Sequence, residues 1–197
     1  MKSVIHLFSA FTSFLFFSSV FIALCALALI LTTYLVIFGN FEKVSGPVVG
    51  IVFAGVVLIY NYNVLFRSSF QANSERKKWM LEHQGLLVRI LVVAGIIALV
   101  ASAGLTLNGI VFITHLFFIS LVYGWPLKWK NRTVAFRSIP IIKPFLIAYV
   151  WSAVTVIFPL LESGSNLFEV EVFGIFISRF IFILALVLPF DIRDCKA

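Results

Sequence analysis

Two aspartates near the end of the chain have the residue type and the spacing of a cation site. Asp191 and Asp194 are three residues apart, so on a helix they share one face. Neighbouring carboxylates repel each other unless a cation lies between them, and Mg²⁺ is the common cation where a phosphate is the other ligand. The alternative is a solvated helix end, in which Arg193 and Lys196 balance the two charges. The pair indicates either a magnesium–phosphate site or an ordinary polar helix terminus.

Further polar residues follow two other apolar segments. Asn61 and Asn63 are two residues apart and point to different sides of a helix, whereas Asn63 and Arg67 are four apart and share a side. Tyr123 and Lys128 lie at the end of another apolar segment, in the stretch Tyr-Gly-Trp-Pro-Leu-Lys. Carboxylates, amides and bases beside apolar helices suit an amphiphile with a diphosphate head and a hydrocarbon tail.

The composition indicates which solvent surrounds the elements that position these groups. Of the 197 residues, 62% are hydrophobic and 12% are charged, and the mean hydropathy is +1.12. Water-soluble domains are about half apolar and about a quarter charged. Because a chain of this length has too little interior to bury so much apolar surface, lipid must surround most of it. A soluble enzyme, a secreted disulfide scaffold and a disordered tail are excluded.

The apolar residues occur in runs of about twenty, the length that a helix needs to cross about 30 Å of hydrocarbon. The pattern predicts an all-α polytopic transmembrane bundle with about six spans. These are residues 11–38, 47–66, 86–105, 109–127, 142–161 and 172–190. The first run is longer than one crossing, and its start, around residues 5–8, is expected to lie along the membrane interface.

The distribution of charge predicts the orientation of the spans. Residues 67–84 carry Arg67, Arg76, Lys77 and Lys78, and residues 128–143 carry five further bases. The connections at residues 106–108 and 162–171 contain no base, and the second contains three glutamates. Because basic loops stay on the cytoplasmic side, we expect an integral membrane protein with both termini in the cytoplasm. The bases then face lipid headgroups, so membrane lipid is an expected partner and nucleic acid is not.

Taken together, the polar segments resemble the motifs of the UbiA superfamily of intramembrane prenyltransferases. Asp-Ile-Arg-Asp at residues 191–194 is similar to the start of the family's second aspartate-rich motif, D-I-x-D-x-x-x-D. Residues 123–128 resemble the family's Y-x-x-P-L-K after the fourth span. Asn61 or Asn63 falls where the family's first motif, N-D-x-x-D, begins. The order and sidedness of the three segments fit the family along essentially the whole chain.

This resemblance implies a UbiA-like fold and a Mg²⁺-dependent transfer of a prenyl group from a prenyl diphosphate to a small-molecule acceptor. It assigns Asp191 and Asp194 to the metal, and Asn63, Arg67 and Lys128 to the diphosphate, with Asn61 and Tyr123 as further candidate site residues. In such a site the metal and the bases would neutralise charge on the leaving oxygen.

Two departures from the family pattern keep an alternative open. The first motif lacks an aspartate, because the family's aspartate position is Arg67 when counted from Asn63 and Leu65 when counted from Asn61. The family has more spans than the six counted here, so we expect a single transmembrane domain over residues 1–197 that is incomplete at its C-terminus. Arg67 would either pair directly with the diphosphate or mark a site that has lost its chemistry. The alternative function is a non-catalytic membrane protein: a lipid-binding scaffold, a transporter subunit or an inactive prenyltransferase remnant.

Two features outside this set also carry charge. Arg179 lies within the last span, where a charge costs about 2.5–3.5 kcal/mol on insertion scales. It must line a cavity or bond to a partner, and the sequence does not choose between the two. Residues 74–79 are expected to form a helical loop that faces the headgroups, with Trp79 as an interfacial anchor, in preference to a lid over the diphosphate.

Overall fold

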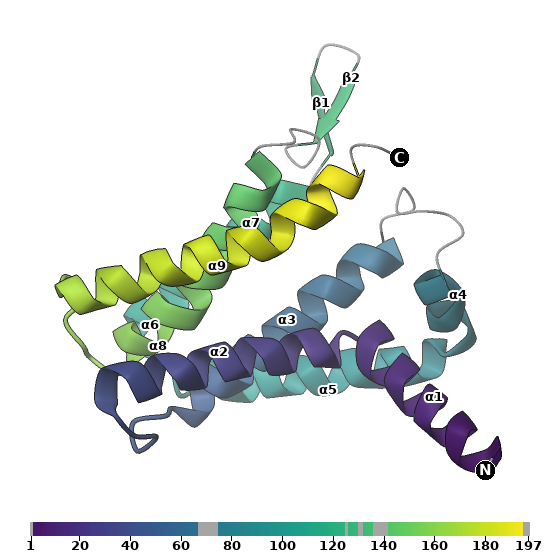
Figure 1. Cartoon of the computed structure of the whole chain (residues 1–197), viewed down its shortest axis with the longest axis horizontal. Coiled ribbons are helices and arrows are strands. Elements are labelled where there is room, and N and C mark those ends of the chain that lie inside the picture. The colour runs from purple at the N-terminus through teal and green to yellow at the C-terminus, as the bar shows by residue number, and fades with distance from the viewer. Residues whose placement is uncertain (1, 67–74, 125, 130–131, 136–141, 195–197) are drawn as a thin grey trace. The chain divides into compact units, whose positions relative to one another are not determined.

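The computed structural model describes residues 2–66, 75–124, 126–129, 132–135 and 142–194 (Figure 1). The contacts divide the chain into two compact units. Unit 1 comprises Met1–Ala28 and Val49–Gly104, and unit 2 comprises Leu29–Val48 and Leu105–Ala197. Each unit is described by itself. The expectation of a single transmembrane domain stays a prediction.

Helices make up most of the described chain. They are α1 (Lys2–Phe17), α2 (Val20–Phe38), α3 (Gly46–Phe66), α4 (Glu75–Glu82), α5 (Gln84–Ser102), α6 (Leu107–Gly124), α7 (Ile142–Ser152), α8 (Phe158–Glu162) and α9 (Val170–Asp194). A π-helical segment, Ala153–Ile157, joins α7 to α8. Strands β1 (Pro126–Trp129) and β2 (Arg132–Ala135) pair antiparallel, a hairpin that the apolar pattern does not predict.

Four helical segments are long and apolar enough to cross a membrane. They are Val20–Phe38, Gln84–Ser102, Ile142–Glu162 and Val170–Pro189. Shorter apolar helical stretches, Gly46–Tyr62 and Leu107–Ser120, overlap the second and fourth predicted spans. The prediction of an all-α, multi-pass membrane protein is confirmed to this extent: four helical segments are long and apolar enough to cross a membrane. The six crossings and their orientation stay predictions.

The first predicted span is divided into two helices. α1 ends at Phe17 and α2 begins at Val20, and between them Ser19 has a φ of +65°. A positive φ is uncommon for a residue that carries a side chain, and it ends a right-handed helix. The prediction of one continuous span from residue 11 to residue 38 is therefore wrong. α2 alone has the length that a crossing requires.

Small residues form the packing interface of unit 1. The side chains of Ala23, Ala54, Val57 and Ala94 form a buried cluster between α2, α3 and α5. A Cβ atom added to Gly50 would lie 3.2 Å from the Cβ of Ala101, so α3 and α5 approach closely there. Helices in lipid associate largely through such packing, because lipid tails already solvate their apolar side chains.

A proline determines the shape of the fifth predicted span, in unit 2. Pro159 has no N–H, so the carbonyl of Thr155, four residues earlier, loses its helical donor. The Phe158 N–H instead bonds to the Ala153 oxygen five residues back, which is the π-helical turn. The Thr33 hydroxyl, from α2, lies 2.8 Å from the Thr155 oxygen and supplies the missing donor. The α7–α8 span and α9 then pack through Val156, Leu160 and Val172.

Candidate functional site

Several predicted site residues lie at one end of unit 2. Thr106, just before α6, bonds to Glu162 at the end of α8, so α6 begins where the α7–α8 span ends. α9 follows a short turn and runs back alongside α7 (Figure 1). The C-terminal ends of α6 and α9 therefore lie at the end where α7 begins, and β1 follows α6 directly.

The backbone of the predicted metal and diphosphate residues can be placed at this end. Tyr123 is in the last turn of α6, Lys128 pairs with Thr133 in the hairpin, and Asp191 and Asp194 are in the last turn of α9. The side chains of these predicted residues lie outside the described part of the chain. Their contacts stay predictions, although the spacing of the two aspartates on a helix keeps them on one face.

The first-motif residues belong to unit 1. Asn63 lies near the end of α3 and its side chain is outside the described part, and Arg67 lies outside the described residues altogether. Among the side chains that are described, no group of three or more His, Cys, Asp or Glu could hold a metal. The two C-terminal aspartates are not among those side chains. The predicted metal assignment is neither supported nor opposed by this finding.

Asn61 is the predicted site residue whose side chain is described, and its amide is engaged inside unit 1. It is fully buried in α3. Its Nδ2 donates to the carbonyl oxygens of Ser18 at 2.9 Å and Val57 at 2.8 Å. The Ser19 hydroxyl lies 3.4 Å from its Oδ1 and donates to it. One N–H of the amide therefore satisfies the Ser18 carbonyl at the break between α1 and α2, and the other bonds to Val57 within α3.

Arg76, in α4, donates hydrogen bonds to residues at the same break, a role that was not predicted from the sequence. Its Nε donates to the Phe17 carbonyl at 3.2 Å and its Nη2 to the Ser19 hydroxyl at 2.7 Å. Burial lowers the pKa of the Arg76 guanidinium from its ordinary value, because a low-dielectric environment disfavours the charged form. The pair of serines inside an apolar run is the signal in the sequence that marks this position.

The helix expected at residues 74–79 is present as α4, which begins at Glu75. The Trp79 ring lies 5.7 Å from the Phe17 ring and stacks on His83 at 4.4 Å. Within unit 1, α4 is thus attached to the end of α1 by Arg76 and by an aromatic contact. The interfacial role of Trp79 and the alternative of a lid over the diphosphate both stay predictions.

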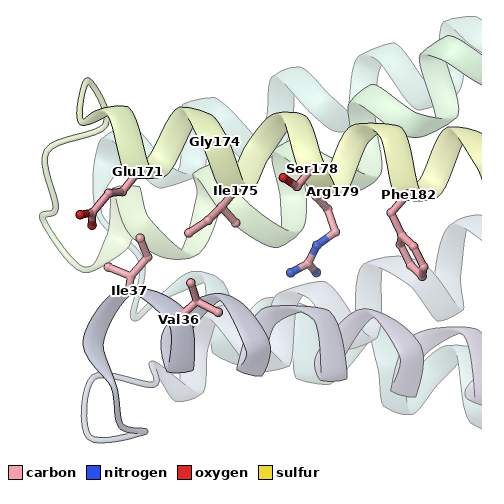
Figure 2. A pocket seen from close by; sticks show the side chains of 8 residues that line it. All are labelled: Val36, Ile37, Glu171, Gly174, Ile175, Ser178, Arg179 and Phe182. Atoms are coloured by element: carbon pink, nitrogen blue, oxygen red, sulfur yellow. The ribbon is translucent and has the colours of Figure 1, made fainter.

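Arg179 lies near the middle of α9, and Figure 2 shows its guanidinium directed at α2. Nη1 donates to the Leu29 carbonyl at 2.9 Å, and Nη2 donates to the Thr32 hydroxyl at 2.9 Å. Arg179 also lines a cavity of about 660 Å³. The other lining residues are Val36 and Ile37 of α2 and Glu171, Gly174, Ile175, Ser178 and Phe182 of α9. Both alternatives left open by the sequence, a bonded partner and a cavity, are present together.

Comparison with known proteins adds no family to these observations. No family model, no curated protein and no solved structure matches the chain. The chemistry of the residues and their placement in the two units are the grounds on which a function rests.

Proposed function

We propose that the chain is a UbiA-like intramembrane prenyltransferase that transfers a prenyl group from a prenyl diphosphate to a small-molecule acceptor. The observation that supports this is the placement of Tyr123, Lys128, Asp191 and Asp194 at one end of unit 2. Acidic, phenolic and basic residues thus gather where apolar helices end. An amphiphile needs such a surface, because its charged head must stay at headgroup level while its tail lies among apolar helices.

The residues at this end match the charges of the proposed reaction. Lys128 supplies a cation for a diphosphate. The resemblance also assigns Asn63 and Arg67, which belong to unit 1, to the diphosphate. Asp191 and Asp194 fit Mg²⁺ because they occupy one face of the last turn of α9 and are oxygen ligands. Asp191 and Asp194 would hold the Mg²⁺, whose charge would neutralise negative charge on the departing diphosphate.

The reaction breaks the bond between the allylic carbon and the diphosphate oxygen, and the acceptor forms a bond to that carbon and releases a proton. Lys128 binds the diphosphate and stabilises the charge that develops on its leaving oxygen. The apolar helices beside them exclude water from the prenyl chain until the acceptor captures it.

The orientation follows from the basic loops and can be tested separately. The proposal places residues 67–84, residues 128–143 and both termini in the cytoplasm. Single cysteines at Lys78 and Asn166, both exposed, are introduced after Cys25 and Cys195 are replaced by serine. In intact cells, a membrane-impermeant maleimide is expected to label the cysteine at position 166 and not the one at position 78. The reverse pattern would contradict the orientation.

The binding chemistry is tested with farnesyl and geranylgeranyl thiolodiphosphates, which resist turnover, and with the chain in lipid nanodiscs. We expect binding that needs Mg²⁺ and is lost on chelation. Asp191→Asn and Asp194→Asn are each expected to weaken Mg²⁺-dependent binding by at least about tenfold, because each removes a charged ligand. Glu169→Gln, just before α9 and at its other end, is the matched control and should bind as the wild type does.

The corresponding activity is Mg²⁺-dependent release of diphosphate from the natural prenyl diphosphates. Activity that survives both aspartate substitutions would show that the site lies elsewhere. Absence of Mg²⁺-dependent binding for every chain length would favour the non-catalytic alternative, a lipid-binding membrane protein.

A further inference from the structure

The cavity beside Arg179 presents opposite charges in a fixed order along α9 (Figure 2). Glu171 lies in the first turn of the helix, and Arg179 lies eight residues further on, about 12 Å at about 1.5 Å per residue. Gly174 and Ser178 lie between them, and Phe182 lies one turn beyond Arg179. From the helix start toward the middle of the span, the α9 lining is therefore anionic, then small except for Ile175, then cationic and finally apolar.

The charge of Arg179 is not balanced by the residues that the structure describes. Its hydrogen-bond acceptors are a carbonyl and two hydroxyls, the weakest being Thr33 Oγ1 at 3.5 Å from Nη2. A guanidinium has five N–H donors, so Nε–H and one Nη1–H remain without an acceptor in the described part of the chain. Charged groups within a span pair with one another or with backbone carbonyls, and the uncharged Leu29 carbonyl leaves the positive charge of Arg179 unbalanced. The geometry therefore calls for an anion beside Arg179.

Depth in the membrane indicates which anion it is. Because α9 is long enough to span the bilayer from its first turn, Glu171 lies near the headgroup level and Arg179 lies deeper. The guanidinium also leans back toward the start of the helix, as long side chains on helices do. A phospholipid with an amino head has the same order from the surface inward: ammonium, phosphate, and then acyl chains.

We propose that this cavity binds a zwitterionic aminophospholipid of the surrounding bilayer, with its phosphate at Arg179 and its ammonium at Glu171. Its first acyl carbons then lie against Phe182, one turn beyond Arg179. The volume of about 660 Å³ falls within the range of about 300–1,000 Å³ typical of small-molecule sites. The proposal depends on α9 spanning the membrane and is independent of prenyl transfer.

Gly174 gives the sharpest test, because it lines the cavity and a Cβ added there meets no atom within 4 Å. Gly174→Leu projects a branched apolar side chain from this unobstructed Cβ position into the cavity. Gly95 of α5, at which an added Cβ also meets nothing, provides Gly95→Leu as the matched control. The chain is reconstituted in nanodiscs of equal phosphatidylethanolamine and phosphatidylglycerol, and the lipid retained per chain is counted by native mass spectrometry.

The wild type is expected to retain one phosphatidylethanolamine in preference to phosphatidylglycerol. Gly174→Leu and Arg179→Gln are expected to reduce that retention about tenfold or more, the effect of losing a bond to a charged group. Gly95→Leu and Arg89→Gln, which replaces an exposed arginine of α5, should retain lipid as the wild type does. Because loss of Arg179 also removes bonds to α2, Gly174→Leu is the decisive variant if Arg179→Gln fails to fold.

Substitution of Glu171 distinguishes a zwitterionic lipid from an anionic lipid in the cavity. Glu171→Gln removes the partner of the ammonium and leaves the partner of the phosphate, so bound lipid should persist while the preference for phosphatidylethanolamine disappears. Equal retention of the two lipids by the wild type, or an unchanged preference in Glu171→Gln, would overturn the proposal. Full retention in Gly174→Leu, or a second copy of the chain in place of lipid, would overturn it as well.

Discussion

The Thr33 hydroxyl donates a hydrogen bond of 2.8 Å to the carbonyl oxygen of Thr155, the group that Pro159 leaves without a helical donor. The same hydroxyl lies 3.1 Å from the Leu29 oxygen of its own helix, so the bond to Thr155 is the shorter of the two. Thr33 and Thr155 are both fully buried. A proline in one span is thus compensated by a threonine in another, which joins α2 to the α7–α8 span.

Thr33→Val tests this relationship with little change in shape. The substitution leaves the Thr155 carbonyl buried without a donor, so we expect unfolding to become easier by about 1–3 kcal/mol. The free energy of unfolding can be measured in mixed micelles by titration with denaturing detergent. Thr114→Val is the matched control, because Thr114 is exposed on α6 and its substitution should change stability little. Equal effects of the two substitutions would contradict the assigned role of Thr33.

Pro159→Ala is expected to make the Thr33 hydroxyl dispensable. Alanine at position 159 restores an N–H four residues after Thr155, which lets the carbonyl bond within its own helix. In this background Thr33→Val should be much less destabilising, with a coupling energy of about 1 kcal/mol or more in a double-mutant cycle. Additive effects of the two substitutions would show that Pro159 does not orphan the carbonyl.

The positions of the spans could be predicted from the sequence because they depend on local apolar length. The second and fifth predicted spans begin within a residue of α3 and α7, and α9 covers the sixth. The serine pair marks the position of the break but does not by itself predict one, because serines are tolerated inside apolar helices. The groups that make the break stable, the amide of Asn61 and the guanidinium of Arg76, come from distant positions in the chain.

Only two features of the candidate site could be predicted from the sequence: which residues share a helix face and which lie at the ends of the spans. Placing Asp191 and Asp194 on one face needs only their separation. The engagement of Asn61 by Ser18 and Val57 depends on how α1, α2 and α3 pack, which no local pattern contains. The bonds of Arg179 to Leu29 and Thr32 likewise join residues that are 150 and 147 positions apart in the chain.

Gly109→Ala is expected to be destabilising because the added methyl group meets the Glu162 side chain. The Glu162 carboxylate accepts from the Thr106 hydroxyl at 2.7 Å, and Gly109 N–H donates to that hydroxyl oxygen at 3.1 Å. A methyl group at Gly109 would overlap the Glu162 carboxylate. The overlap should lower the free energy of unfolding by about 1–3 kcal/mol.

The sign of that effect should reverse when the carboxylate is removed. In a Glu162→Ala background, Gly109→Ala meets no carboxylate and gains the helix propensity of alanine, about 0.5–1 kcal/mol. Both effects can be measured by the same detergent titration. Destabilisation by Gly109→Ala in both backgrounds would contradict the overlap.

Arg76→Met is expected to change the angle between α1 and the first half of α2. The substitution removes the donors to Phe17 and Ser19, which favours a continuous helix through the break. Spin labels on the exposed residues Phe8 and Leu24 report the change, because sixteen residues of straight helix span about 24 Å. We expect the distance between the two labels to be shorter than about 24 Å in the wild type. In Arg76→Met it should increase toward about 24 Å. Arg89→Met on α5 should leave the wild-type distance unchanged.

The break between α1 and α2 also has a consequence for the order of events during synthesis. Its hydrogen-bond partners Asn61 and Arg76 follow Ser19 by 42 and 57 residues. Until these residues have been synthesised, the carbonyl groups of Ser18 and Phe17 lack the side-chain donors that they have in the folded chain. We therefore expect the first apolar run of the nascent chain to be one longer helix, which acquires its bend only after α4 has been made.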